Sequence, residues 1–205
     1  MELIAHRGLW NKHIKDNSYE AIKLALENPA YSGVEVDVRV TKDNEFVLYH
    51  NHFYHNKLVK KTNFKKMTDV CKLESILKIP TSKIILLEIK DFSLNINKLL
   101  NLLNKYPRNV YLMSFSSKLM AKFQKKTNKY PLGVLNYVLN SDSQYDLDFI
   151  CLLDCIASSN IIKNFQERNI AVFIYGVINI DKNVKYIVDD YKVRKNIIKN
   201  NKSIV

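Results

Sequence analysis

The chain alternates between short strand-like segments and longer helix-like segments. The strand-like segments are apolar runs, or runs in which apolar and polar residues alternate, and the sequence predicts nine of them. They span residues 2–5, 33–40, 45–49, 84–89, 110–114, 132–135, 148–153, 171–177 and 186–188. Helices are predicted over residues 17–27, 69–77, 93–105, 116–127 and 159–168. Asp16 is expected to cap the first helix, with Ala21, Leu24 and Ala25 on its apolar face.

Strands that alternate with helices are typical of βα units and a mainly parallel sheet. The sequence therefore predicts an α/β fold, a compact TIM-type (β/α)8 barrel with shortened later helices. Because nine segments exceed the eight strands of such a barrel, at least one lies outside it or is misassigned. A doubly wound sheet is the alternative, but the chain has only 4 glycines and no Gly-rich dinucleotide loop. No linker-like stretch interrupts the 205 residues, so we expect a single domain over residues 1–205.

The segment 33–40 is the most informative strand. It reads Gly-Val-Glu-Val-Asp-Val-Arg-Val, so valines alternate with Glu35, Asp37 and Arg39. A strand places alternate residues on opposite faces, which gives one face of valine and one face of charge. In an ordinary half-buried strand the valines would face the core and the charges would face water. In an enzyme barrel the valines would face the outer helices, and the two carboxylates would form a metal site in the mouth.

Composition narrows the class of protein. The chain is 47% hydrophobic, which is typical of a globular protein. No apolar run reaches the roughly 18 residues of a membrane span, and the first residues lack the pattern of a signal peptide, so we expect a cytoplasmic protein. The cysteines Cys71, Cys151 and Cys155 are odd in number and lack zinc spacing, which favours reduced, buried thiols.

The net charge of +12 favours partners that carry phosphate. The candidates are nucleic acid, an anionic lipid surface and a phosphorylated substrate. However, the lysines are scattered apart from short runs such as Lys60-Lys61 and Lys125-Lys126. The excess of lysine, asparagine and isoleucine is also what an AT-rich coding sequence produces. We therefore expect no dedicated nucleic-acid surface.

Charged residues stand at the ends of two further predicted strands. His6 and Arg7 follow the first strand directly, where a βα barrel places its active site. Glu88 and Lys90 share one face at the end of an apolar strand. Burying a lone carboxylate is costly, so Glu88 needs a cation. Either Lys90 or a metal shared with the carboxylates of segment 33–40 would serve.

His50 ends the strand segment that follows residues 33–40. The two segments are joined by too few residues for a helical crossover, so they are expected to form a hairpin. With a two-residue turn at Asp43-Asn44, counting outward along both strands places Asp37 opposite His50. The hairpin would then set an imidazole beside the carboxylates.

These residues amount to three carboxylates, two histidines, an arginine and a lysine. Three oxygen ligands with room for water suit Mg²⁺ or Ca²⁺ better than a soft metal. Two histidines suit general acid and base work near neutral pH. An arginine and a lysine suit a phosphate. The combination indicates cleavage of a phosphodiester.

The same residues lie in motifs by which the chain resembles the glycerophosphodiester phosphodiesterase family. The motifs follow the family's order and cover most of the chain. They are Ile4-Ala5-His6-Arg7-Gly8, Asp16-Asn17-Ser18, Gly33-Val34-Glu35-Val36-Asp37-Val38, Thr41-Lys42-Asp43, Val47-Leu48-Tyr49-His50 and Leu87-Glu88-Ile89-Lys90, with weaker echoes at Met113-Ser114-Phe115, Pro131-Leu132-Gly133-Val134-Leu135 and Ile187-Val188-Asp189-Asp190.

The resemblance implies a phospholipase-C-like βα barrel and one divalent cation, Mg²⁺ or Ca²⁺. Each role is carried over only to the matching position. The catalytic acid/base pair is His6 and His50, the metal ligands are Glu35, Asp37 and Glu88, the phosphate-contacting residues are Arg7 and Lys90, and Tyr175, where the family typically has tryptophan, stacks over the substrate.

The resemblance also implies a mechanism. The substrate's own glycerol hydroxyl acts as the nucleophile, one histidine removes its proton, and the other protonates the leaving alcohol. A cyclic phosphate forms and is then hydrolysed. The products would be glycerol 3-phosphate and an alcohol such as choline, ethanolamine or glycerol, so the expected partner is a small-molecule glycerophosphodiester.

The chain departs from the family pattern at three other places. Asn51 stands where members commonly have Asp, and Asp16-Asn17-Ser18 stands for Glu-Asn-Thr. The segment between His50 and Glu88 is short, which gives a reduced insertion loop and a more open pocket. Two alternatives therefore stay open. One is lysophospholipase-D-type cleavage of a lysophospholipid headgroup, with transient contact to an anionic membrane surface; the other is a catalytically weak relative that only binds phosphodiesters.

Overall fold

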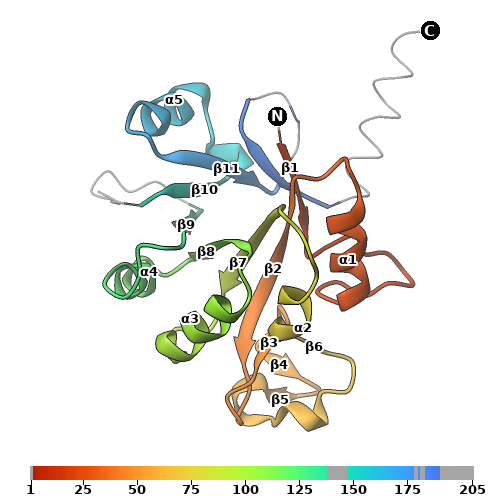
Figure 1. The fold of residues 1–205 in the computed structure, drawn as a ribbon. Coiled ribbons are helices and arrows are strands. Elements are labelled where there is room, and N and C mark those ends of the chain that lie inside the picture. Colours follow the sequence, from red (N-terminus) through yellow and green to blue (C-terminus); the bar gives the residue numbers. More distant parts are fainter. Residues whose placement is uncertain (1, 138–146, 178–179, 181–182, 190–205) are drawn as a thin grey trace, which may run out of the picture.

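In the computed structural model, which describes residues 2–137, 147–177, 180 and 183–189, the parallel strands close into a ring (Figure 1). Each barrel strand pairs with two neighbours, and the first strand pairs with both the second and the last. The eight barrel strands are β1 (Glu2–His6), β2 (Gly33–Val40), β7 (Ile84–Ile89), β8 (Asn109–Ser114), β9 (Leu132–Asn136), β10 (Phe149–Leu153), β11 (Ala171–Tyr175) and β12 (Lys185–Val188). The predicted (β/α)8 barrel is confirmed.

Helices surround the ring on its outer side (Figure 1). They are α1 (Tyr19–Glu27), α2 (Leu73–Leu77), α3 (Ile96–Lys105), α4 (Ser117–Gln124) and α5 (Ser159–Glu167). Three single 3₁₀ turns lie at Val59–Lys61, Phe64–Lys66 and Asp154–Ile156. Among the described residues no helix combines the length and the apolar character that a membrane crossing requires. The sequence also predicts a short helix and a tail over residues 189–205, of which only Asp189 belongs to the described residues.

The strand segment that exceeds the barrel count is β3 (Phe46–Leu48). It pairs antiparallel with the end of β2, outside the ring, and it also pairs with the short strand β6 (Cys71–Lys72). Between them residues 51–70 form a small insertion with the hairpin β4 (Phe53–Tyr54) and β5 (Lys57–Leu58). This insertion packs on its own apolar cluster of Val47, Tyr54, Val59, Met67 and Val70.

The two faces of β2 enter different environments. Val34, Val36 and Val38 pack in the large core between the barrel and its helices. Glu35 and Asp37 point to the other side and are buried, with 2% and 1% of their surface exposed. The valines therefore face the helices and the carboxylates face the barrel interior, as the barrel interpretation of this segment requires.

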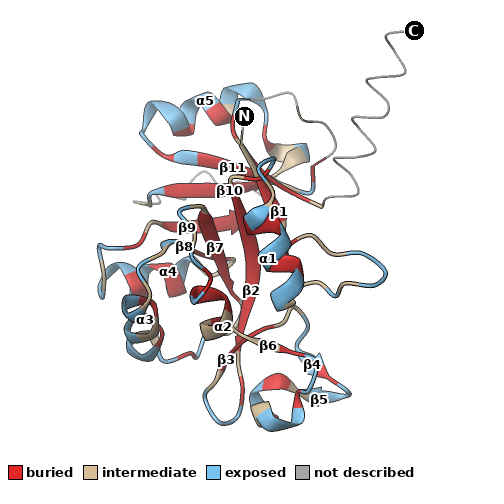
Figure 2. Ribbon diagram, turned by 45° about the vertical axis from the view of Figure 1, so that its right-hand side comes forward, coloured by how far each residue is buried: buried red, intermediate tan, exposed pale blue. Residues whose placement is uncertain are grey.

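Apolar side chains fill the barrel beneath these carboxylates. This inner cluster is separate from the outer core and consists of Ile4, Ile84, Leu86, Met113, Leu135, Phe149, Cys151, Phe173 and Ile187. Figure 2 shows the strands as the buried centre of the molecule. A filled barrel has low polarity, so charges at its mouth are solvated on one side only.

The predicted hairpin exists, but its register differs by one residue. Val38 pairs with Leu48 and Val40 with Phe46, so Asp37 stands opposite Tyr49, whose amide donates to its carbonyl at 3.0 Å. The turn has three residues rather than two, because Asn44 takes a left-handed conformation at φ 58°. His50 nevertheless reaches the barrel mouth, one residue beyond the expected pairing.

The N-terminus of α1 also differs from the expectation. Ser18, not Asp16, is the cap, and its hydroxyl accepts a hydrogen bond from the amide of Ala21. Asp16 is instead drawn to the guanidinium of Arg7, 3.2 Å away. Leu24, expected on the buried face, is 38% exposed.

Gly133 on β9 is predicted to tolerate no side chain. A Cβ at this position would lie 2.2 Å from the ring of Phe149, which packs inside the barrel. We expect Gly133→Ala to destabilise the fold by about 1–3 kcal/mol through overpacking. Thermal unfolding should show a Tm lower by about 2–12 °C. An unchanged Tm would show that the barrel interior is not closely packed here.

Candidate active site

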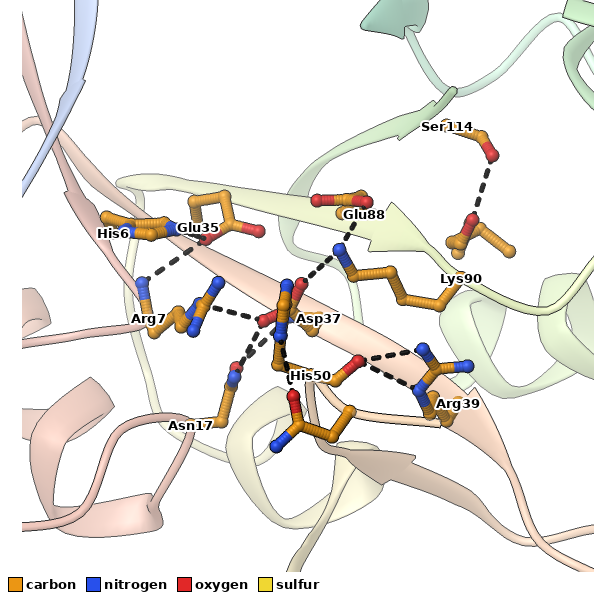
Figure 3. Close-up of polar contacts among 12 residues, drawn as sticks. His6, Arg7, Asn17, Glu35, Asp37, Arg39, His50, Glu88, Lys90 and Ser114 are labelled. Atoms are coloured by element: carbon orange, nitrogen blue, oxygen red, sulfur yellow. Dashed lines mark hydrogen bonds and ion pairs between the residues drawn. The ribbon is translucent and has the colours of Figure 1, made fainter. Parts of the chain in front are cut away.

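Strand pairing alone brings the charged residues of three strands together at the carboxyl end of the barrel. The β1–β2 register sets His6 beside Glu35, and the β2–β7 register sets Asp37 beside Glu88. Figure 3 shows the resulting cluster, into which Lys90 also points. The predicted carboxylates and His6 therefore meet because parallel strands end at the same edge.

The three carboxylates form a compact, buried group. One oxygen from each of Glu35, Asp37 and Glu88 lies within 4.8 Å of the others. At most 7% of each residue is exposed. Glu35 Oε1 and Asp37 Oδ1 are buried without a hydrogen-bond partner. Closely spaced carboxylates, two of them with an oxygen that lacks a hydrogen-bond partner, are the kind of donor set that Mg²⁺ or Ca²⁺ prefers, so the residues present fit the implied metal.

Two cations lie against this group. Lys90 Nζ is 2.6 Å from Glu88 Oε1 and 3.0 Å from Asp37 Oδ1. Arg7 Nε is 3.1 Å from Asp37 Oδ2, and its backbone amide donates to Glu35 Oε2 at 3.2 Å. These contacts to Asp37 are close in distance, but neither makes an aligned hydrogen bond.

Burial and mutual repulsion set the protonation of the carboxylates. Burial raises the pKa of Glu35 well above its usual range, and the charges of Asp37 and Glu88 raise it further. Burial also raises the pKa of Glu88, although Lys90 opposes the shift. For Asp37 the effect of burial is outweighed by Lys90 and Arg7, so its pKa is lowered. The group therefore resists full ionisation unless a further positive charge is added.

The two histidines flank the carboxylates. His6 Nε2 lies 3.9 Å from Glu35 Oε2, and its Nδ1 lies 2.7 Å from a carboxylate oxygen of Asp189. His50 Nδ1 lies 3.1 Å from the side-chain oxygen of Asn51. Burial lowers the pKa of His50, and the attraction of Asp37 only partly offsets this.

Asp189 and Asn17 contact His6 and Asp37, although no role was predicted for either residue from the sequence. Asp189 follows β12, so its position at a strand end was the available signal. Asn17 holds Asp37 from both sides: its amide donates to Asp37 Oδ2 at 2.8 Å, and its oxygen accepts from the Asp37 amide at 3.0 Å. Asn17 has a φ of 54°, a conformation that asparagine tolerates better than most residues. This contact further lowers the pKa of Asp37.

A cavity of about 310 Å³ opens above the carboxylates. One side is polar and includes both histidines, Arg7 and Lys90. The other side carries the aromatic rings of Phe115, Tyr137 and Tyr175, the first two stacked at 4.6 Å. The Tyr175 hydroxyl donates to the carbonyl of Asn136 at 3.2 Å, and burial raises its pKa. A larger surface groove of about 520 Å³ along α3 contains none of these residues.

Comparison with protein families matches residues 6–95 to the "Glycerophosphoryl diester phosphodiesterase family". The matched part contains seven of the eight residues predicted for the site; Tyr175 lies outside it. No curated protein sequence matches the chain.

Solved structures share the fold over the whole chain. A glycerophosphodiester phosphodiesterase from Thermotoga maritima is 20% identical, with a TM-score of 0.78 over 95% of this chain and 97% of that one. One from Parabacteroides distasonis is 19% identical, with 0.78 over 98% of each chain. A phosphodiesterase from Oleispira antarctica, solved with the product sn-glycerol-3-phosphate, is 15% identical, with 0.79 over 97% of each chain. At these identities the likeness shows the fold alone.

The raised pKa of Glu35 predicts how stability depends on pH without metal. The unfolded chain ionises this carboxyl near its ordinary pKa of about 4.3, whereas the folded chain does so only at higher pH. The fold therefore loses stability as the pH rises between the two values. We expect Glu35→Gln to raise the Tm of metal-free protein at pH 8 by about 2–8 °C, and to have little effect at pH 5.

The control for this measurement is Glu167→Gln, which removes an exposed carboxylate on α5 and should leave the Tm unchanged. Saturating Ca²⁺ or Mg²⁺ should stabilise the wild type more than Glu35→Gln. An equal effect of the substitution at pH 5 and pH 8 would contradict ionisation as its cause.

Proposed function

We propose that the chain, whose residues 6–95 match the glycerophosphoryl diester phosphodiesterase family, is a phosphoric diester hydrolase of that family. The chain hydrolyses small glycerophosphodiesters to glycerol 3-phosphate and an alcohol. It uses one divalent cation, Mg²⁺ or Ca²⁺, and the pair His6 and His50. One observation carries the proposal: three buried carboxylates lie within 4.8 Å of one another beside a cavity that is lined by two histidines and two cations.

Glu35, Asp37 and Glu88 would hold the metal. When bound, it would polarise the phosphoryl oxygens and neutralise charge that develops on them. Arg7 and Lys90 lie beside the carboxylates and line the same cavity. They would form ion pairs with the phosphate of a bound substrate, and they would stabilise the additional negative charge of the transition state.

His50 is suited to accept the proton of the glycerol hydroxyl, because its lowered pKa keeps the imidazole neutral at pH 7. His6 would give a proton to the leaving alcohol, since the Asp189 carboxylate at Nδ1 fixes the ring while Nε2 lies on the side of the carboxylate group. The hydroxyl oxygen bonds to phosphorus as the bond to the alcohol breaks. Water then opens the cyclic phosphate with the two roles reversed.

The departures from the family pattern fit this proposal. Asp16 reaches Arg7 despite its shorter side chain, and Asn51 accepts a hydrogen bond from His50 as an aspartate would. Tyr175 lies on the aromatic side of the cavity, where its ring would pack against the part of the substrate beyond the phosphate. We further propose a single domain over residues 1–205 and a cytoplasmic location.

Removal of either histidine is expected to abolish turnover. We expect His6→Gln and His50→Gln each to lower kcat for glycerophosphocholine by about 10²–10⁴-fold, since each removes a general acid or base. Chelation of divalent cations should remove the activity, and added Ca²⁺ or Mg²⁺ should restore it. Release of glycerol 3-phosphate, measured by a coupled assay, reports both effects.

The matched control is His13→Gln, an exposed histidine of the β1–α1 loop, which should retain full activity. A folded, metal-loaded wild type that cleaves no glycerophosphodiester would refute the proposal. Calorimetric binding of glycerol 3-phosphate without turnover would instead identify a phosphodiester-binding relative.

A surface feature supports the second candidate, cleavage of a lysophospholipid headgroup at an anionic membrane. Residues 51–68 of the insertion contain five lysines and no acidic residue. All five side chains, Lys57, Lys60, Lys61, Lys65 and Lys66, are exposed, and Phe53 beside them is 57% exposed. The insertion begins directly after His50. Cations with an exposed aromatic ring next to the mouth are the groups that bind an anionic lipid surface.

This candidate predicts that the protein binds phosphatidylserine vesicles through the insertion. We expect Lys60, Lys61, Lys65 and Lys66→Gln together to weaken co-sedimentation at least tenfold, since each lysine near the surface contributes about 1 kcal/mol. The matched control replaces Lys118, Lys122, Lys125 and Lys126, exposed on and just after α4, and should bind as the wild type does. Equal loss in both variants, or no vesicle binding at low salt, would contradict it.

A further inference from the structure

Arg39 is a buried cation that none of the steps above uses. It follows Asp37 on the inward face of β2, and 3% of its surface is exposed. Three of its nitrogens make contacts, yet none reaches Glu35 or Asp37. Arg39 therefore does not neutralise these carboxylates. Because β2 runs toward the mouth, residue 39 lies above the metal ligands and not below them.

The guanidinium of Arg39 instead hydrogen-bonds to the backbone carbonyl of His50. Arg39 Nε and Nη2 both donate to the His50 carbonyl oxygen, at 3.0 and 2.7 Å. Figure 3 shows the two bonds converging on that oxygen from one planar group. Nη1 lies 3.3 Å from His52 Nδ1, so the same side chain also contacts the first turn of the insertion. A planar fork of donors fixes orientation as well as distance.

Asp91, in the loop that follows β7, holds the fork in place. Its Oδ1 accepts from Arg39 Nη1 at 2.8 Å, and its Oδ2 accepts from the Val40 amide at 2.7 Å. Asp91 follows Lys90, which contacts the carboxylate group. Successive residues of one loop thus contact the metal-ligand group and the arginine fork.

His50 needs such a support because it lies beyond regular pairing. The β2–β3 ladder ends at Val38 and Leu48, and the amide of Tyr49 makes the last backbone bond to β2. His50 opens the insertion, and within the part of the chain that the structure describes its side chain hydrogen-bonds to the exposed Asn51 alone. Without the fork, the backbone of this histidine would be held from one side.

We propose that Arg39 and Asp91 are positioning residues that hold His50 at the distance catalysis requires. The inference rests on the proposed role of His50. It follows that β2 positions two parts of the site at once, because Glu35 and Asp37 would bind the metal and Arg39 holds the backbone of His50. A displacement of about 1 Å at a catalytic group lowers a rate by about 10²-fold. The fork therefore acts on the chemical step, while substrate and metal binding depend on other residues.

The decisive variant is Arg39→Lys, which keeps the charge but lacks the planar pair of donors that converges on the His50 carbonyl oxygen. We expect kcat for glycerophosphocholine to fall at least tenfold, with KM and calorimetric Ca²⁺ affinity within twofold of wild type. Hydrogen exchange of residues 49–53 should become faster. Asp91→Asn keeps the shape of the side chain but weakens its bond to Arg39, and it should lower kcat about threefold. This variant tests the positioning role if Arg39→Lys does not fold.

The matched control is Lys185→Gln, which breaks the Lys185–Glu2 ion pair between β12 and β1 at the opposite end of the barrel. It should change thermal stability and leave kcat unchanged. The inference is overturned if Arg39→Lys folds and keeps its kcat, or if KM rises and Ca²⁺ affinity falls by as large a factor as kcat falls. An inactive wild type would refute the proposed function itself, whereas active wild type with an unaffected Arg39→Lys refutes only the positioning role.

Discussion

Repulsion among three buried carboxylates is the constraint around which the mouth of this barrel is organised. Glu35, Asp37 and Glu88 approach within 4.8 Å of one another where water is largely excluded. Such a group is stable only if positive charge or protons accompany it. Lys90 and Arg7 supply part of that charge, but burial still keeps the pKa values of Glu35 and Glu88 above their usual range. A protein gains nothing in stability from this arrangement, which is why a ligand-binding role explains it best.

Much of the arrangement is readable from the sequence, for a physical reason. Parallel strands end at one edge, so polar residues at the ends of apolar strands must converge, whatever the loops do. The alternation along Gly33–Val40 also allows only two orientations of the strand. A barrel permits the orientation in which the valines face outward, toward the helices. Consequently the fold and the meeting of His6, Glu35 and Glu88 depend on features that repeat along the chain.

What the sequence could not provide depends on single residues and on turns. The hairpin register shifted because Asn44 adopts a left-handed conformation, which adds one residue to the turn. Asn17 also takes such a conformation, and its two bonds to Asp37 arise from a loop with no periodic pattern. The partner of Arg39 was missed because a charge pattern gives the face of a strand but not the height of a residue above its neighbours. The position of a residue along the barrel axis follows from the direction of its strand, and that direction is defined only once the strands are placed in the closed ring.

The closed ring also determines when the site can be completed. His6 on the first strand contacts Asp189 after the last strand, across 183 residues of sequence. During synthesis the three carboxylates and both histidines leave the ribosome with the first half of the chain, long before β12 exists. The partner that fixes the His6 ring arrives only when β12 pairs with β1 and β11. The catalytic pair is thus assembled only when β12 docks. A chain that ends before β12 carries the metal ligands, but its His6 ring lacks the contact that orients it.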